Sequence, residues 1–261
     1  METKITYLGG ATYLIEIGSF RLLTDPGFDA EGTERSEGPG HDLKKVMSPP
    51  IAAEDIGRID AVLLSHQQHY DNLDNTGRAM LPQWGRVITT PESAAQLEGL
   101  GEGLATWQTT ELSNDAGETI RVTGTPAVHA ESPEIQAATG ATMGFVLEWD
   151  GQQNGALWIT GDSVYFDGLE EVADRFDVGT AILHLGSANV PAVGDNALTM
   201  NGADGARITE KVGAKQVFPA HFEGWMHYRE GRDGIAAAFA DAGLSERLVF
   251  APLGEAVDVA V

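Results

Sequence analysis

The stretch IDAVLLSHQQHYDNLD (residues 59–74) joins an apolar run to a dense group of polar side chains. Its first part, IDAVLL, is rich in aliphatic residues and predicts a buried strand. Its second part places two histidines, two aspartates and a tyrosine directly after that strand. In α/β sheets, ligands bind where strands end and loops begin. The stretch therefore predicts a strand that delivers metal-capable side chains to the edge of a sheet.

Three further strand-like runs end in the same way. His129 follows VTGTPAV, Asp162 follows ALWITG and His221 follows QVFPA. Because imidazole and carboxylate groups bind divalent metals, these endings together predict one shared metal site. The chain has no cysteine, so such a site must use nitrogen and oxygen ligands, and thiolate catalysis is excluded.

Three other histidines have different expected roles. His41 lies in a polar, glycine-rich segment and is expected to be a surface or hydrogen-bonded residue. His184, inside the apolar run AILHLG, is expected to be a buried, hydrogen-bonded histidine that lines the pocket at most. For His227, in EGWMHY, two interpretations stay open: a pocket wall or plain surface.

Strand and helix patterns alternate along the chain. Three short strand-like runs separated by glycine-containing turns open it, and strands alternate with helices in the second half. This pattern predicts a layered α/β architecture in a single domain over residues 1–261. Helices are expected at 75–84, 91–101, 168–176, 201–213 and 231–243, long loops at 27–50 and 131–144, and a strand-like end at 247–259.

Composition restricts the partners. Asp and Glu outnumber Lys and Arg 39 to 16, and the formal net charge is -23. Because a phosphate backbone would be repelled by this surface, nucleic acid is not an expected partner, and a small-molecule substrate is. The sequence contains no apolar run long enough to span a membrane and no signal-peptide pattern, so we expect a cytoplasmic protein. The oligomeric state is left open.

Five motifs in order resemble the metallo-β-lactamase superfamily: ITYLGGATYLIEIGSFRLLTDPGF, SHQQHYDNLD, TPAVHAE, WITGDSVYF and VFPAHFEGW. The resemblance is to the branch that includes ascorbate-6-phosphate lactonase-like and N-acylphosphatidylethanolamine phospholipase D-like hydrolases, and it covers nearly the whole chain. It implies a four-layer αββα sandwich, with two sheets packed together and helices on both outer faces.

The superfamily motif H-x-H-x-D-H is altered in this chain. Without a gap, Gln68 and Tyr70 would occupy ligand positions. With one inserted residue the pattern becomes H-x-x-H-x-D-N, formed by His66, His69, Asp71 and Asn72. Residues three apart on a strand point to opposite faces, so His66 and His69 can share an ion only if the segment curls.

The resemblance also implies metal ligands. His66, His69 and His129 would hold a first ion, Asp71 and His221 a second, and Asp162 would bridge them. Asn72 stands where the family has a second-site histidine, and an amide oxygen is a weaker donor than imidazole. The second ion is therefore expected to be loose, absent or of a harder type, or Asn72 serves only to orient Asp71.

The implied function is a metal-dependent hydrolase in which a metal-bound hydroxide cleaves an ester, lactone, phosphoester or amide. Zn²⁺ is the expected cofactor, as one or two ions, with Mn²⁺ or iron as alternatives. Asp71 would orient the attacking water or relay its proton, and His66 and His69 would hold the catalytic ion. The chain has no G-x-S-x-G nucleophile elbow and no P-loop.

Three rival functions remain. Gln67, Gln68 and Asn72 favour a degenerate protein with weak or no metal and a binding role. An RNA-processing nuclease is opposed by the net charge of -23. A redox di-iron enzyme is possible from histidine and carboxylate ligands, although no flavin-binding module is evident.

Residues around the site have predicted supporting roles. We expect Asp25 to accept hydrogen bonds, Asp74 to cap a helix or to orient a ligand from behind, and Gly161 to allow a close backbone approach beside Asp162. Loops 27–50, 131–144 and 222–231 are expected to surround the pocket. Its candidate wall residues are Phe28, Met143, Phe222, Trp225, Met226 and Tyr228, and its nearest cations Arg229 and Arg232.

Overall fold

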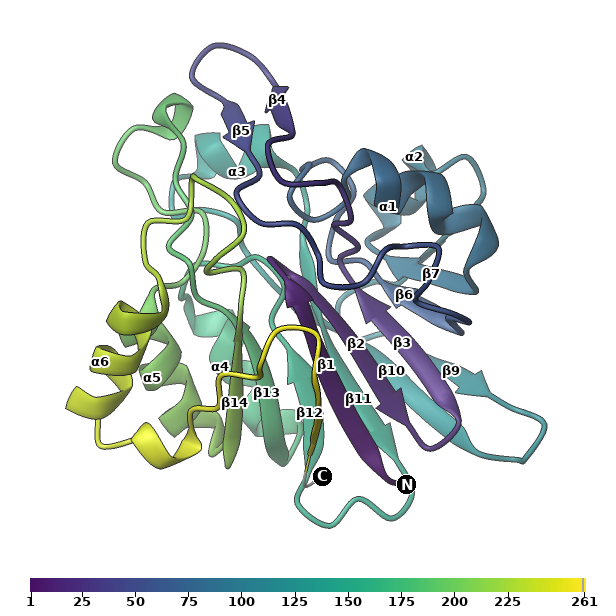
Figure 1. The fold of residues 1–261 in the computed structure, drawn as a ribbon. Helices are drawn as coiled ribbons and strands as arrows, with labels where there is room; N and C mark the ends of the chain where they lie inside the picture. Colours follow the sequence, from purple (N-terminus) through teal and green to yellow (C-terminus); the bar gives the residue numbers. More distant parts are fainter. Residues whose placement is uncertain (260) are drawn as a thin grey trace.

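The computed structural model, which describes residues 1–259 and 261, contains two β-sheets packed face to face (Figure 1). The first sheet has the strand order β15-β1-β2-β3-β6-β7-β8. Strands β1 to β3 pair antiparallel, and β3, β6, β7 and β8 pair parallel. The strands are β1 (Thr3–Gly9), β2 (Thr12–Ile17), β3 (Phe20–Thr24), β6 (Ala61–Leu63), β7 (Arg86–Thr89), β8 (Gly101–Gly103) and β15 (Ala256–Asp258).

The second sheet has the order β14-β13-β12-β11-β10-β9. Its strands β9 to β12 pair antiparallel, whereas β12, β13 and β14 pair parallel. Consequently β10, β12, β13 and β14 run in one direction and end at the same edge of the sheet. The strands are β9 (Thr109–Ser113), β10 (Thr119–Pro126), β11 (Met143–Trp149), β12 (Ala156–Ile159), β13 (Val178–His184) and β14 (Gln216–Ala220).

The alternation of side chains along the first sheet builds two cores. In β2, Ile15 faces the second sheet and joins the main core, while Leu14 faces outward and joins a second apolar cluster. In β6, Leu63 and Val62 divide in the same way. This period-two pattern buries both faces of the first sheet, so each face requires a covering layer.

Helices provide the two outer layers (Figure 1). Helices α1 (Asn75–Met80) and α2 (Pro91–Gln96) cover the first sheet, and α4 (Asp167–Arg175), α5 (Gly202–Val212) and α6 (Arg232–Asp241) cover the second. Buried residues of α4, α5 and α6, such as Leu169, Ile208 and Phe239, belong to the main core. The predicted four-layer αββα sandwich is confirmed.

Some local predictions are wrong. The segment 131–144 contains a helix, α3 (Pro133–Thr139), and the segment 27–50 contains a short hairpin, β4 (Glu34–Ser36) and β5 (Asp42–Lys44). The strand predicted at 247–259 shrinks to β15 because Pro252 has no backbone N–H and interrupts the pairing. The described part of the chain also contains three short 3₁₀ helices: η1 (Leu81–Gln83), η2 (Pro191–Val193) and η3 (Ser245–Arg247).

Among the described residues, no helix is both long and apolar enough to cross a membrane. The prediction of one domain over the whole chain stays a prediction.

Candidate metal centre

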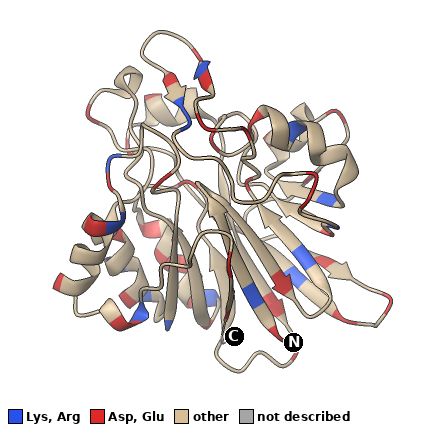
Figure 2. Ribbon diagram, in the orientation of Figure 1, with Lys and Arg blue, Asp and Glu red and all other residues tan. Residues whose placement is uncertain are grey.

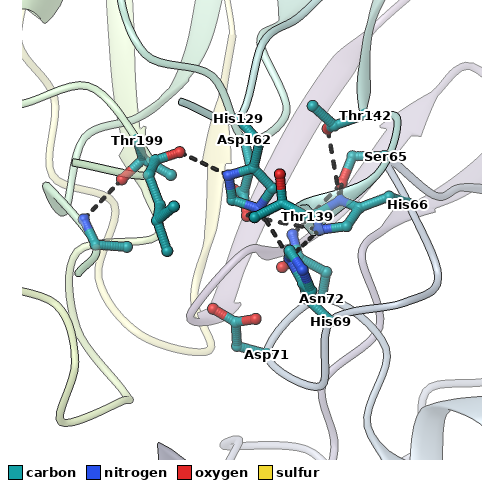
Figure 3. Close-up of polar contacts among 12 residues, drawn as sticks. Ser65, His66, His69, Asp71, Asn72, His129, Thr139, Thr142, Asp162 and Thr199 are labelled. Carbon is teal, nitrogen blue, oxygen red and sulfur yellow. Dashed lines mark hydrogen bonds and ion pairs between the residues drawn. The ribbon is translucent and has the colours of Figure 1, made fainter. Parts of the chain in front are cut away.

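Three histidines from two distant segments meet at the edge of the sandwich (Figure 3). Nε2 of His66 lies 2.9 Å from Nδ1 of His69, and Nε2 of His129 lies 2.8 Å from that same atom. The chain bends after β6 and then turns, because the amides of Asn72 and Leu73 bond to the carbonyl of His69. The bend satisfies the geometric condition for His66 and His69 to face one point.

Hydrogen bonds behind two of these rings determine which nitrogen carries a proton. Nδ1 of His129 lies 2.7 Å from the Leu198 carbonyl, which can only accept, so Nε2 carries a lone pair. The Ser65 hydroxyl donates to Asp25 and therefore accepts from Nδ1 of His66, so that Nε2 is also unprotonated. Both lone pairs face Nδ1 of His69, which can donate to only one of them. A cation at this point would satisfy all three nitrogens.

Burial keeps these imidazoles in the form that binds metal. It lowers the pKa of His66 to about 3 and holds the pKa of His69 well below its ordinary value. Both rings are therefore neutral at physiological pH, and metal binding at His66 and His69 needs no proton release.

A second group of donors lies beside the first. Nε2 of His221 is 3.0 Å from Oδ2 of Asp71 and 3.2 Å from Oδ2 of Asp162. Oδ2 of Asp162 is also 3.9 Å from Nε2 of His66 and 3.8 Å from Nε2 of His129. One carboxylate oxygen thus faces both groups, which is the position required of a bridging ligand.

The second donor group contains two buried carboxylates, whose negative charge requires a positively charged partner. Burial acts to raise the pKa values of Asp71 and Asp162, but nearby histidines outweigh it and hold both pKa values well below the ordinary range. Burial acts to lower the pKa of His221, but the two carboxylates outweigh it and raise that pKa to about 10. In the contacts of the described residues these carboxylates have histidine partners and no lysine or arginine. The donor set therefore suits a divalent cation.

Two histidines outside the predicted set hold the carboxylates. Nδ1 of the fully buried His184 is 2.7 Å from Oδ1 of Asp162, as expected of a buried, hydrogen-bonded histidine. Nε2 of His227 is 2.9 Å from Oδ2 of Asp71, and His227 lines the cavity above it. Of the two interpretations left open for His227, the structure supports the pocket wall. The sequence analysis did not predict its contact with Asp71. The one sequence signal for that contact was the position of His227, six residues after the candidate ligand His221.

The side-chain amide of Asn72 lies between the two carboxylates. In the amide orientation that places Nδ2 toward the carboxylates, Asn72 donates to Oδ1 of Asp71 and to Oδ2 of Asp162, both at 3.1 Å. The residue is fully buried. Of the two predicted roles of Asn72, these contacts favour the orienting one.

Gln67 and Gln68 do not face the donors. Nε2 of Gln68 donates to the carbonyls of Thr139 and Ala141, which connects the motif to the end of α3. Nε2 of Gln67 donates to Gln96 at the end of α2. The inserted residue therefore anchors the loop, and both donor groups remain complete without it.

The predicted supporting roles are confirmed at three positions. Asp25 accepts from the backbone amide and hydroxyl of Ser65, and Asp74 accepts from the amide of Gly77 as the N-cap of α1. Gly161 has φ +61°, and a Cβ there would lie 2.2 Å from the Met143 carbonyl oxygen. A side chain at position 161 would collide with backbone directly beside Asp162.

A cavity of about 260 Å³ lies over the two donor groups. Besides the candidate ligands, its lining includes His41, Leu43, Glu134, Ile135, Ala138, Thr139, Ala188, Val190, Ala192, Val193, Leu198 and His227. His41 was expected to be a surface or hydrogen-bonded residue. It is half-buried beside Glu37 and contributes to this lining.

The predicted wall residues are wrong, because none of the six lines this cavity. Phe28 packs against Trp84 behind the first sheet, and Met143 and Phe222 belong to the main core. Met226 is 63% exposed. Phe28, Met143 and Phe222 thus lie near the motifs in sequence but point into other layers of the sandwich.

The remaining wall and cation candidates also have other partners. Trp225 packs in a third apolar cluster behind the lining, and the Tyr228 hydroxyl lies 3.4 Å from Asp71. Arg229 donates to Asn189, and Arg232 stacks over Phe250.

Known proteins that are similar to this chain include proteins named as metal-dependent hydrolases. Residues 20–222 match a family model described as the beta-lactamase superfamily domain. A protein from Pyrobaculum aerophilum that is named a metal-dependent hydrolase is 23% identical over 223 residues, covering 84% of each chain.

Two solved structures share the fold. The isothiocyanate hydrolase from Delia radicum gut bacteria has a TM-score of 0.82 at 19% identity, covering 99% of this chain and 100% of that one. CmlA, a diiron beta-hydroxylase from Streptomyces venezuelae, has a TM-score of 0.69 at 14% identity, covering 99% of this chain and 54% of that one. At these identities the likeness concerns the fold alone.

Proposed function

This chain belongs to the beta-lactamase superfamily and is a metallo-hydrolase, and from that premise we propose that it activates a water molecule to cleave an ester, lactone, phosphoester or amide bond of a small molecule. Membership confirms the family resemblance seen in the sequence. The observation that carries the proposal is the position of Asp162, whose Oδ2 atom faces both donor groups.

The residues that would hold metal form two sets that share Asp162. We assign His66, His69 and His129 to a first ion, and Asp71 and His221 to a second. Divalent ions bound there would lower the pKa of a water molecule toward about 7 and polarise the bond to be cleaved. We propose Zn²⁺, as one or two ions. Mn²⁺ and iron also suit these ligands, and the structurally similar CmlA is named a diiron protein.

The protein's own groups orient the water and receive its proton. Asp71 is the proposed acceptor, because it is ionised and lines the cavity. His221 and His227 contact its Oδ2 atom and Asn72 contacts its Oδ1 atom, so the carboxylate is fixed in one orientation. His129 is oriented through the Leu198 carbonyl.

The rival functions have less support. Gln67 and Gln68 anchor the loop, which removes much of the argument for a degenerate site. The net charge of -23 still opposes a nuclease.

The test combines metal analysis with turnover. Purified protein is analysed for Zn, Mn and Fe, and activity on esters, lactones, amides and phosphodiesters is measured with and without a chelator. We expect activity that depends on metal, and loss of at least about 100-fold in kcat/KM in His129→Ala and Asp162→Asn. Asp258→Asn, at an exposed carboxylate, is the matched control. Full turnover and unchanged metal content in His129→Ala would overturn the assignment.

A further inference from the structure

We propose that the cavity over the metal centre binds an uncharged, compact apolar group of the substrate and discriminates against substrates whose non-reacting part is anionic. This inference rests on the proposed hydrolase function and names the substrate class that the same site selects. It is carried by the lining of the cavity opposite the donor groups.

The wall opposite the metal ligands is aliphatic. Leu43, Ala188, Val190 and Leu198 belong to the third apolar cluster, and Ile135 and Val193 pack against it. These residues come from β5, α3, η2 and the segments that flank η2, which together close the cavity above the strand ends. An apolar substituent placed here would leave water and contact hydrocarbon on this side.

Apart from the metal ligands, the lining side chains that could donate to an anion are His41, His227 and Thr139, and each already has another partner in Glu37, Asp71 or the Ile135 carbonyl. No lysine or arginine lines this cavity in residues 1–259, and Glu134 adds a carboxylate to its rim. The neighbouring cations are engaged elsewhere: Arg35 stacks on Tyr70 and Lys45 binds Asp74. An anionic substituent would therefore lose its hydration with no lysine or arginine in the lining to neutralise its charge.

The charge of the whole molecule acts in the same direction. Acidic residues are spread over the helices and loops and outnumber Lys and Arg (Figure 2). With a net charge of -23, the protein slows the approach of an anion before it reaches the cavity.

The volume limits the size of the group. A cavity of about 260 Å³ lies below the range of roughly 300–1,000 Å³ found for drug-sized ligands, so it suits a short chain or a single ring. Burial of one methylene corresponds to about a fourfold gain in kcat/KM.

The test uses 4-nitrophenyl esters with one leaving group and varied acyl chains. We expect kcat/KM to rise from acetate to butyrate to hexanoate. The hexanoate should exceed the adipic acid mono-ester, which has the same chain length and a terminal carboxylate, on the order of 30-fold. Equal or better turnover of the adipate ester would overturn the proposal while leaving the hydrolase function intact.

A charge placed in the wall tests the location. Val193→Arg introduces a cation at a half-buried lining position, and we expect the hexanoate-to-adipate preference to fall at least about tenfold. Val193→Leu keeps the wall apolar, so this variant should still prefer the hexanoate. Val46→Arg adds the same charge at an exposed position outside the cavity, and should leave the hexanoate-to-adipate preference unchanged. Ala192→Arg, on the exposed side of the same turn, is used if Val193→Arg fails to fold. An unchanged preference in the folded arginine variant would place the binding group elsewhere.

Binding separates failure of this inference from failure of the hydrolase function. If no ester is cleaved, saturation-transfer NMR on the metal-loaded protein compares the binding of hexanamide with that of adipamate, the six-carbon amide that carries a terminal carboxylate. Weaker hexanamide binding in Val193→Arg than in Val193→Leu would support the pocket while rejecting ester hydrolysis. Equal hexanamide binding in the two variants would reject the pocket assignment.

Discussion

His227 is a single residue whose importance depends on one hydrogen bond. It lies on the loop after β14, and its Nε2 atom is 2.9 Å from Oδ2 of Asp71. Partners of this kind orient a carboxylate ligand and typically change metal affinity or activity 10- to 100-fold when they are removed.

We therefore expect His227→Ala to lower kcat by about 10- to 100-fold while the ion held by His66, His69 and His129 remains bound. The measurement is kcat and KM together with the metal content. Met226→Ala, at the exposed neighbouring position, is the control and should behave as wild type. A kcat unaffected by His227→Ala would show that Asp71 needs no such support.

The residue scale also shows what a sequence can predict about a site. His66, His129, Asp162 and His221 were predicted as ligands because each closely follows a strand, and strand direction is a strong constraint on position. Asp71 was predicted from the family resemblance. Asn72 and His227 were ambiguous because their roles depend on side-chain contacts between loops. No periodicity in the chain records those contacts.

At the scale of elements, the β4–β5 hairpin carries a titratable pair beside the cavity. Burial, and then the charge of Asp71, raise the pKa of Glu37 to about 7, with Arg35 acting in the opposite direction. The Glu37 carboxylate lies 3.5 Å from Nε2 of His41. Because the folded pKa lies above the ordinary value of 4.5, Glu37 contributes stability below pH 4.5 that is lost as the pH rises through about 7.

Between pH 5 and pH 8, we expect the Tm of wild type to fall by about 2–6 °C relative to the Tm of Glu37→Gln. Thermal unfolding of both proteins across this range is the measurement. Glu31→Gln, at an exposed position of the same segment, should show no such trend. Parallel Tm curves for wild type and Glu37→Gln would contradict the assignment.

Elements also explain where the sequence prediction failed. Helix α3 begins with Ser132 as N-cap and Pro133 in its first turn, which is a recognisable start. It extends for only seven residues and is mostly exposed, so it has no apolar period to reveal it. The pocket wall was assigned to residues near the motifs, whereas η2 lies far from every motif in sequence and reaches the site through the tertiary fold.

At the scale of the whole molecule, the two sheets bring buried carboxylates and histidines together at one edge of the sandwich. Asp71 and Asp162 are 6% and 1% exposed. Burying such charges costs free energy, and a bound cation offsets that cost only in the folded state.

Metal binding should therefore stabilise the fold. At a free Zn²⁺ concentration 100 times Kd the gain is about 2.7 kcal/mol, which corresponds to roughly 5–10 °C in Tm for a chain of this size. Calorimetry before and after chelation, with Zn²⁺ added back, is the measurement. The shift should be lost in Asp162→Asn and kept in Asp258→Asn, and a Tm indifferent to chelator in wild type would argue against a bound ion.

Leu198 links the two halves of the site, since its carbonyl orients His129 while its side chain lines the cavity. A substitution of the Leu198 side chain keeps this backbone carbonyl, but a change of bulk there would shift the backbone that orients His129, so substrate preference and ligand alignment are coupled at this position. At positions 135, 190 and 193 the lining can vary without disturbing the imidazoles. Laboratory evolution toward new substrates should accumulate changes at those three positions and leave Leu198 unchanged. The evolved variants should then differ in substrate range while their metal affinity is conserved.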